Sequence, residues 1–274
     1  MTPTEARRLL EDYGLAPRRS AGQNFVVDPN TVRRIVTAAE LHPDDTVLEF
    51  GPGLGSLTLP LADAVRHVVA VEIDAGFVQV LQDRFADRDD VRIVHADAMA
   101  VDLREILGGV PARLVANLPY NVATPLVVHA LDAPEVVDAF VMVQREVGQR
   151  WCAPPGHPLR AGISVKLQLL ADVEVVFPIP RTVFYPVPNV DSVMVRLRRR
   201  VDAPGGTERE ALAELVEAAF AQRRKTLRNT LRRVADRDHL EAAAMAAGVD
   251  LGARAETLPK EAFRRLATAL GPDA

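Results

Sequence analysis

The chain has 274 residues, of which 48% are hydrophobic and 26% charged, as in an ordinary globular protein with room for about two domains. This composition excludes a disordered, collagen-like or low-complexity chain. The single cysteine, Cys152, excludes an internal disulfide and a cysteine zinc site. We find no leader-like segment and no apolar run of ~18 residues, so we expect a soluble, cytoplasmic protein.

The charge is unevenly distributed along the chain. The net charge is −4, but residues 181–233 contain twelve basic and six acidic residues, a local net charge of +6. A basic segment in an acidic protein indicates an anionic partner that approaches from one side. Taken alone, this feature is explained more simply by a solvated charged surface.

The first element that the sequence predicts clearly is a helix after residue 28. Asp28 is suited to cap it and Pro29 to occupy its first position, and apolar residues recur at helical spacing over residues 32–39. Apolar, β-branched segments then alternate with helical ones. This alternation predicts an α/β fold, a parallel sheet with helices on both faces. The predicted strands are 46–50, 67–73, 91–96, 113–117 and 138–144, and the helical segments between them include 56–64, 75–87 and 122–132.

The last part of the chain changes character. Two more strands are predicted at 172–179 and 192–199, joined by a proline-rich loop, and residues 198–208 are typical of a linker. An alanine-rich helical region follows. We therefore expect a ligand-binding domain over residues 1–200 and a small helical domain over residues 207–274.

One long helix is expected at about 208–235. Its apolar residues form one stripe for docking, and Lys225, Arg228 and Arg232 form a cationic stripe on another face. These three residues are candidate contacts to an anionic partner. A second candidate patch alternates along the last predicted strand: Arg196, Arg198 and Arg200.

A glycine-rich turn, residues 51–55 (GPGLG), directly follows the first predicted strand. Such a turn between a strand and a helix lets backbone amides approach a ligand closely. The spacing G-x-G-x-G lacks the third glycine of the dinucleotide fingerprint and the lysine–hydroxyl pair of the phosphate-binding loop, which disfavours a nicotinamide oxidoreductase. A purely structural turn remains an alternative.

Two carboxylates follow the next strands. Because ligands of doubly wound sheets bind beyond the carboxyl ends of the strands, Glu72 is suited to bind ribose hydroxyls and Asp97 the exocyclic amine of an adenine. The alternatives are an exposed acidic strand end and a capping aspartate. The six histidines do not pair at metal-ligand spacing, so no metal site is expected.

Residues 117–121 (NLPYN), after the fourth strand, are the most specific motif. The Asn117 side chain and the Leu118 carbonyl can accept the two hydrogens of a planar amine, and Tyr120 can stack on the attached ring. The alternative is a β-turn with a packing tyrosine.

These motifs together resemble those of the S-adenosylmethionine-dependent ribosomal RNA adenine-N6 dimethyltransferases. The resemblance covers the chain from about residue 15 to 270, and residues 220–229 with 117–121 indicate the small-subunit, kasugamycin-sensitivity (KsgA/RsmA) type. The motifs that agree further are GQNFVVD (22–28), QREVGQR (144–150), FYPVPNVDS (184–192) and FAQRRKTLRN (220–229).

The resemblance implies a class I methyltransferase fold with a mostly parallel seven-stranded sheet and a small all-α C-terminal domain. It implies S-adenosylmethionine as cofactor and methylation of N6 of two adjacent adenosines in a hairpin loop near the 3′ end of 16S ribosomal RNA, in the small (30S) subunit. RNA would then be the anionic partner of Lys225, Arg228 and Arg232. We expect a monomer.

The resemblance also implies roles for individual residues. The catalytic group would be Asn117, Leu118 and Tyr120, with Phe184 stacking on the target base opposite Tyr120. Asn189 stands where the family usually has a lysine, which weakens the case for an RNA contact there. The cofactor-binding residues carried over by position are Asn24, Val26, Gly51, Glu72, Asp97 and Asn117.

Three other functions compete with this interpretation. Related enzymes of the macrolide-resistance type methylate an adenosine of large-subunit ribosomal RNA. Adenine-N6 DNA methyltransferases have a proline where this chain has Leu118. A non-catalytic RNA-binding assembly factor on the same scaffold is disfavoured by the intact Gly51, Glu72, Asp97 and Asn117.

Overall fold

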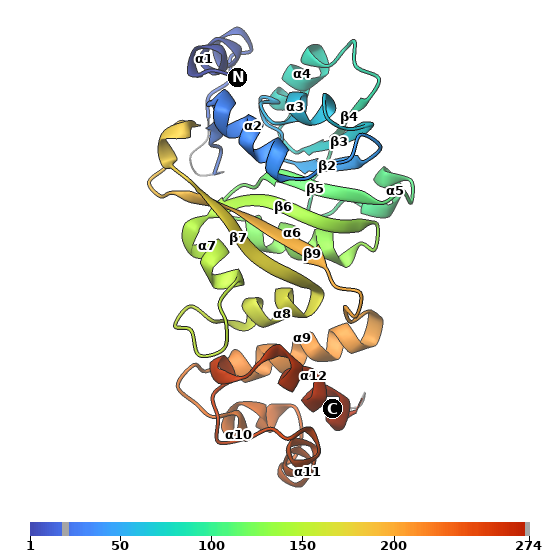
Figure 1. Cartoon of the computed structure of the whole chain (residues 1–274), viewed down its shortest axis with the longest axis vertical. Coiled ribbons are helices and arrows are strands. Elements are labelled where there is room, and N and C mark those ends of the chain that lie inside the picture. Colours follow the sequence, from blue (N-terminus) through green and yellow to red (C-terminus); the bar gives the residue numbers. More distant parts are fainter. Residues whose placement is uncertain (18–21, 272–274) are drawn as a thin grey trace. The chain divides into compact units, whose positions relative to one another are not determined.

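The computed structural model describes residues 1–17 and 22–271, and the chain forms two compact units (Figure 1). The first, which we call the sheet unit, comprises residues 1–148 and 174–198. The second, the helical unit, comprises residues 149–173 and 199–274. In the part of the chain that is described, no helix is long and apolar enough to cross a membrane.

The sheet unit is built on a seven-stranded sheet with the order β4-β3-β2-β5-β6-β9-β7. The first five strands pair in parallel, and β9 runs antiparallel to β6. The predicted strands and the class I methyltransferase fold are confirmed. The strands are β2 (Thr46–Phe50), β3 (His67–Glu72), β4 (Val91–His95), β5 (Ala112–Asn117), β6 (Val136–Gln144), β7 (Ala171–Ile179) and β9 (Ser192–Arg199).

Helices cover both faces of this sheet. Consecutive residues of a strand point to opposite faces of the sheet, and Val47 and Leu48 of β2 are both fully buried, which explains why the central strands are almost continuously apolar. The predicted start of α2 (Pro29–Ala38) is confirmed: the Thr31 amide donates a hydrogen bond to the Asp28 side chain at 2.8 Å. The other helices that follow strands are α3 (Thr58–Ala62), α4 (Ala75–Arg84), α5 (Leu103–Leu107) and α6 (Ala123–Asp132).

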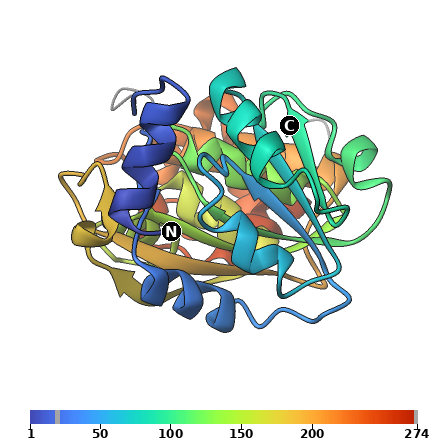
Figure 2. The same ribbon diagram turned by 90° about the horizontal axis from the view of Figure 1, so that it is seen from above.

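Two features of the sheet unit were not predicted. Helix α1 (Pro3–Asp12, dark blue in Figure 2) begins with a capping box of Thr2 and Glu5, a pattern that is visible in the sequence. A two-stranded ribbon joins β1 (Phe25–Val26) to β8 (Phe184–Tyr185), segments far apart along the chain. It brings the proline-rich loop next to the residues that precede α2.

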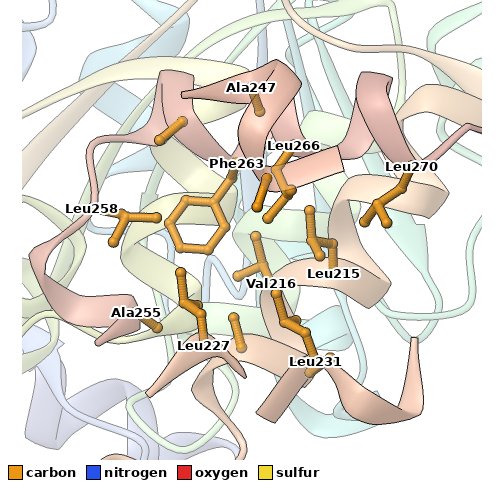
Figure 3. Close-up of a cluster of buried hydrophobic side chains, with 14 of the residues drawn as sticks. Leu215, Val216, Leu227, Leu231, Ala247, Ala255, Leu258, Phe263, Leu266 and Leu270 are labelled. Carbon is orange, nitrogen blue, oxygen red and sulfur yellow. The ribbon is translucent and has the colours of Figure 1, made fainter. Parts of the chain in front are cut away.

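The helical unit has a core of its own, part of which is drawn in Figure 3. Val165 and Leu169 of α8 (Gly162–Leu170) pack in this core with Phe263 and other residues of the C-terminal helices. The expected boundary at residue 200 therefore differs from the compact units, because 149–173 belongs with the C-terminal helices. Those helices are α9 (Gly206–Phe220), α10 (Leu227–Thr230), α11 (Arg237–Ala247) and α12 (Lys260–Leu270), and α7 (Arg145–Trp151) crosses between the units.

The single helix expected over 208–235 is wrong. Helix α9 ends at Phe220, and the chain turns before α10 and a short 3-10 helix, Leu231–Arg233. The amides of Leu227 and Arg228 bond to the carbonyls of Ala253 and Leu251, both at 2.9 Å, instead of to the preceding turn of a helix. The predicted apolar stripe nevertheless lies in the core, with Val216, Leu227 and Leu231 buried.

A buried arginine ties the segments of the helical unit together. The guanidinium of Arg160 donates to the carbonyls of Ala153 at 2.7 Å and Leu258 at 3.0 Å, and to the Gln168 side chain at 3.1 Å. These bonds join the loop before α8 to the segment before α12. Burial lowers the pKa of Arg160 below its usual value.

Candidate active site

The first cavity lies at the carboxyl ends of β2, β3 and β5 and has a volume of about 290 Å³. Strand β2 has β3 on one side and β5 on the other, so the chain reverses its strand order here, which is where ligands of such sheets bind. All six residues that the sequence assigned to a cofactor line this cavity: Asn24, Val26, Gly51, Glu72, Asp97 and Asn117.

The glycine turn brings bare backbone to the cavity wall. Gly51 and Gly53 have φ of +66° and +57°, a region that favours glycine. A Cβ on Gly53 would lie 2.7 Å from the Phe25 ring, so no larger residue fits without a shift. The turn is therefore a close approach of the backbone to whatever fills the cavity.

Glu72 is fixed by backbone amides. One carboxylate oxygen accepts hydrogen bonds from Ile73 at 2.9 Å and Asp74 at 3.0 Å, and the other accepts one from Gly53 at 3.1 Å. A carboxylate has about four acceptor positions, so these three bonds leave room for a ligand donor. Burial raises the pKa of Glu72, and the backbone bonds oppose that shift.

Glu49, which the sequence analysis did not single out, lines the same cavity. Its side chain is 2% exposed, and its Oε2 has no hydrogen-bond partner among the described residues. The Thr58 hydroxyl is near enough to favour the charged form but not in hydrogen-bonding geometry. Burial, with a smaller contribution from Glu72, raises the pKa of Glu49 to about 8, so this carboxyl is protonated at neutral pH.

Asp97 and Asn117 complete the wall. Asp97 accepts a 2.8 Å bond from the Met99 amide with one oxygen, so it stabilises a turn rather than capping a helix, and it also lines the cavity. The Asn117 amide nitrogen donates to the carbonyl of Asn24 at 2.8 Å. That bond fixes the rotation of the Asn117 side chain and leaves its oxygen as an acceptor.

A second cavity of about 370 Å³ shares Gly22 and Asn24 with the first. Tyr120 lines it and is half-buried, and its hydroxyl is 2.7 Å from the Ser192 hydroxyl. The remaining lining residues had no predicted role: Asn121, Gln144, Val187, Pro188, Asn189 and Val190. Gln144 ends β6, and residues 187–190 belong to the proline-rich loop. Both motifs can be recognised in the sequence, but the sequence does not show that they line the same cavity.

Phe184 does not line either cavity, and its predicted stacking on the target base is wrong for this structure. Its side chain is 2% exposed, because the pairing of β8 with β1 sets Phe184 opposite Val26 and directs the ring into the core. The exposed apolar residues Val187 and Val190 of the same loop lie at the second cavity instead. The Leu118 side chain is also buried, so its backbone is the part that could contact a ligand.

The candidate RNA contacts lie in the helical unit. Lys225 and Arg232 are exposed, and among the described residues they form no ion pair. Arg228 is paired with Glu241, which also binds Arg237. These cations do not lie along one helix, because the chain turns between α9 and α10.

The second basic patch is not supported. Arg196 is buried and, with Arg198, pairs with Glu40. Arg200 pairs with Asp172 and Asp202. Their charges are compensated within the protein. Within residues 1–17 and 22–271, no three His, Cys, Asp or Glu side chains gather to hold a metal ion.

The sequence matches the ribosomal RNA adenine dimethylase family over residues 14–271. The chain belongs to this family. A relative from Thermobifida fusca, named ribosomal RNA small subunit methyltransferase A, is 49% identical over 97% of this chain and 95% of its own length. A relative of the same name from Moorella thermoacetica is 41% identical over 98% of each.

Solved structures agree with this membership. The 23S rRNA methyltransferase ErmE superposes with a TM-score of 0.70 and 32% identity, over 90% of this chain and 99% of its own. A dimethyladenosine transferase from Plasmodium falciparum shares the fold, with a TM-score of 0.72 and 21% identity over 87% and 94%. As a member of this family, the protein is an enzyme that uses S-adenosylmethionine.

The first cavity fits this cofactor, which combines an adenosine with a cationic amino acid. Glu72 and Asp97 offer acceptors for hydroxyl and amine donors, and Gly51 and Gly53 of the glycine turn add to the cavity wall. The unpartnered Oε2 of Glu49 offers a further polar atom on the same wall.

Proposed function

We propose that the protein transfers methyl groups from S-adenosylmethionine to N6 of two adjacent adenosines in a hairpin loop near the 3′ end of 16S ribosomal RNA, in the small subunit during ribosome biogenesis. The observation that carries the proposal is the pair of cavities that share Asn24 and meet at the NLPYN turn. The names of the relatives that are 41% and 49% identical support the small subunit as substrate. We further propose that the protein works in the cytoplasm as a monomer.

In the first cavity, Glu72 would hold the ribose hydroxyls of the cofactor and Asp97 its adenine amine. Asn24, Val26 and Gly51 line the remaining wall. The cofactor would supply an electrophilic methyl group on a sulfonium, so the neutral thioether would leave without protonation by an acid. The protein therefore has to bind and orient the two substrates and exclude water from between them.

The target amine is a poor nucleophile, because its lone pair is delocalised into the adenine ring. Asn117 Oδ1 and the Leu118 carbonyl accept its two hydrogens and direct the lone pair toward the first cavity. These bonds strengthen as positive charge develops on nitrogen, so they stabilise the transition state more than the ground state. The 2.8 Å bond from Asn117 to Asn24 maintains this orientation before the substrate arrives.

In the second cavity, Tyr120 stacks on the target base. The apolar residues Val187 and Pro188 of the proline-rich loop cover its other face, in place of Phe184. An unpaired base in a hairpin loop is cheaper to unstack than a base in a duplex. Lys225, Arg228 and Arg232 supply phosphate contacts and hence much of the affinity.

The large-subunit alternative is less well supported. ErmE, whose name specifies 23S RNA, is 32% identical to this chain, whereas the relatives with the small-subunit name are more similar. A non-catalytic assembly factor would have no need for the full set of polar groups that line the first cavity.

The test is single-turnover methylation of an assembled small subunit with labelled cofactor and mass spectrometry of its 16S RNA. Asn117→Ala removes an acceptor at a developing charge and should slow the first methyl transfer by ~10²–10³-fold. Asn30→Ala, on the exposed start of α2, is the matched control and should react like the wild type. Wild-type rates for Asn117→Ala, or no label in the 16S RNA after reaction with the wild-type protein, would contradict the proposal.

A further inference from the structure

The Tyr120 ring is held by a contact from a distant part of the chain. Tyr120 follows β5, Ser192 begins β9, and β6 lies between these two strands in the sheet. The 2.7 Å hydrogen bond between their hydroxyls therefore crosses the carboxyl end of β6, beside Gln144 of the second cavity. Burial raises the pKa of Tyr120, so its hydroxyl is neutral and able to donate.

Ser192 is a rigid anchor for this bond. Its side chain is 0% exposed, and it pairs with Gln144 in the ladder between β6 and β9. The preceding residue, Asp191, accepts bonds from the Arg145 side chain at 2.8 Å and the Arg181 amide at 2.9 Å. The backbone that carries Ser192 is thus fixed on two sides.

The two methyl transfers make different demands on the base platform. Each transfer replaces one N–H bond of the amine by an N–C bond: the proton leaves to water, and the electron pair of the broken S–C bond stays on sulfur. The unmethylated amine donates two hydrogen bonds, to Asn117 and to the Leu118 carbonyl. The monomethylated amine has only one hydrogen left, so stacking must supply a larger share of its orientation.

We propose that Ser192 is a positioning residue that fixes the Tyr120 ring through its hydroxyl and that this bond is needed mainly for the second methyl transfer on each adenosine. The inference rests on the proposed function, specifically on stacking by Tyr120. Loss of the bond leaves the ring in place but free to rotate, and the enzyme then accumulates N6-monomethyladenosine.

The experiment measures single-turnover rates of the first and second transfers for Ser192→Ala, Tyr120→Phe and the double variant. Each single change should slow the second transfer by about 3- to 10-fold, the cost of one net hydrogen bond, and the first by much less. The double variant should be no slower than either single one, because both changes remove the same bond. Tyr120→Phe alters only the partly exposed partner and keeps the test valid if Ser192→Ala folds poorly.

A matched control is Ser164→Ala, since Ser164 is an equally buried serine in the helical unit. Its ratio of second to first rates should equal that of the wild type. An unchanged ratio in Tyr120→Phe, or additive losses in the double variant, would overturn the inference. Tyr120→Ala distinguishes a failure of this inference from a failure of the proposed function. If Tyr120→Ala slows both transfers and Tyr120→Phe slows neither, stacking by Tyr120 is supported and only the role of the Ser192 bond is refuted.

Discussion

Glu49 and Glu72 are buried carboxyl groups on the wall of one cavity, but their hydrogen bonds differ. Glu72 accepts three backbone amides, whereas Oε2 of Glu49 has no partner among the described residues. A buried carboxylate that accepts several amides is stabilised in its charged form, and one that lacks them is not. The difference leads to separate predictions for binding and for stability.

Glu72→Ala should weaken S-adenosylmethionine binding by roughly 10- to 100-fold, because a charged hydrogen bond contributes ~1.5–3 kcal/mol. Calorimetry of the purified protein measures the change. Asp89→Ala, an exposed carboxylate in a surface turn, is the control. Unchanged affinity in Glu72→Ala would remove Glu72 from the cofactor site.

Glu49 should make stability depend on pH. Its pKa is raised from 4.5 to about 8 in the folded protein, so between these values the folded state holds a proton that the unfolded state has lost. The stability from this group is complete below about pH 4.5 and is lost as the pH rises through 8. Urea unfolding at a series of pH values should show Glu49→Gln losing less stability on going from pH 5 to 9 than the wild type. Parallel curves would show that Glu49 is already ionised at neutral pH.

The position of a side chain could be predicted from the sequence where a motif lies directly next to the end of a strand. All six residues assigned to the cofactor line one cavity, although their roles stay predictions. It failed for Phe184, because the direction of that ring depends on the pairing of β8 with β1, and two residues form too short a strand to be detected. Glu49 lies in a strand whose apolar sequence predicts burial. An acidic residue in such a strand indicates a functional group, so its presence could have been predicted from the sequence.

Among the elements, the turn between α9 and α10 changes the expected RNA contacts. An exposed cation without a partner in the protein breaks no ion pair when it binds a phosphate. Arg228 must first break its ion pair with Glu241. Helical periodicity alone placed these residues on one stripe. It could not reveal that the amides of residues 227–228 bond to the loop at 251–253.

Arg232→Ala should reduce the magnitude of the log–log salt slope of RNA binding by about 1, the value for one lost phosphate contact. Arg228→Ala should reduce it by less, because its charge is already partly compensated by Glu241. Filter binding to a small-subunit RNA fragment over a salt series gives both slopes. Arg8→Ala, an exposed cation of α1, serves as control. Equal slopes for Arg232→Ala and the wild type would mean that Arg232 is only a solvated residue.

On the scale of the whole molecule, the alternation of strands and helices was sufficient to predict the sheet, because central strands such as β2 and β3 are almost entirely buried and the helices that follow them are short. The division of the chain into two units is harder to predict from the sequence than the sheet. Helix α8 lies between two strands of the sheet along the sequence, yet its apolar residues Val165 and Leu169 contribute to the core of the helical unit. Local sequence cannot show which of two cores a helix joins.

Hydrogen exchange on the intact protein tests this assignment. In mild denaturant, the amides of α8 should exchange together with those of α9 and α12, as one cooperative unit, and not with those of β5 and β6. Mass spectrometry of peptides that cover residues 162–170 gives the rate. Exchange of this peptide in step with the central strands would assign α8 to the sheet unit.

The discontinuous helical unit has a consequence for the newborn chain. Residues 149–173 leave the ribosome before residues 199–274, with which they form one compact unit. At ~5–20 residues per second, the apolar side of α8 waits ~5–20 s for the last residues of its core to be synthesised. During that interval Val165 and Leu169 lack the residues of α9 and α12 that cover them in the folded protein, so the nascent chain exposes apolar surface until these helices are synthesised.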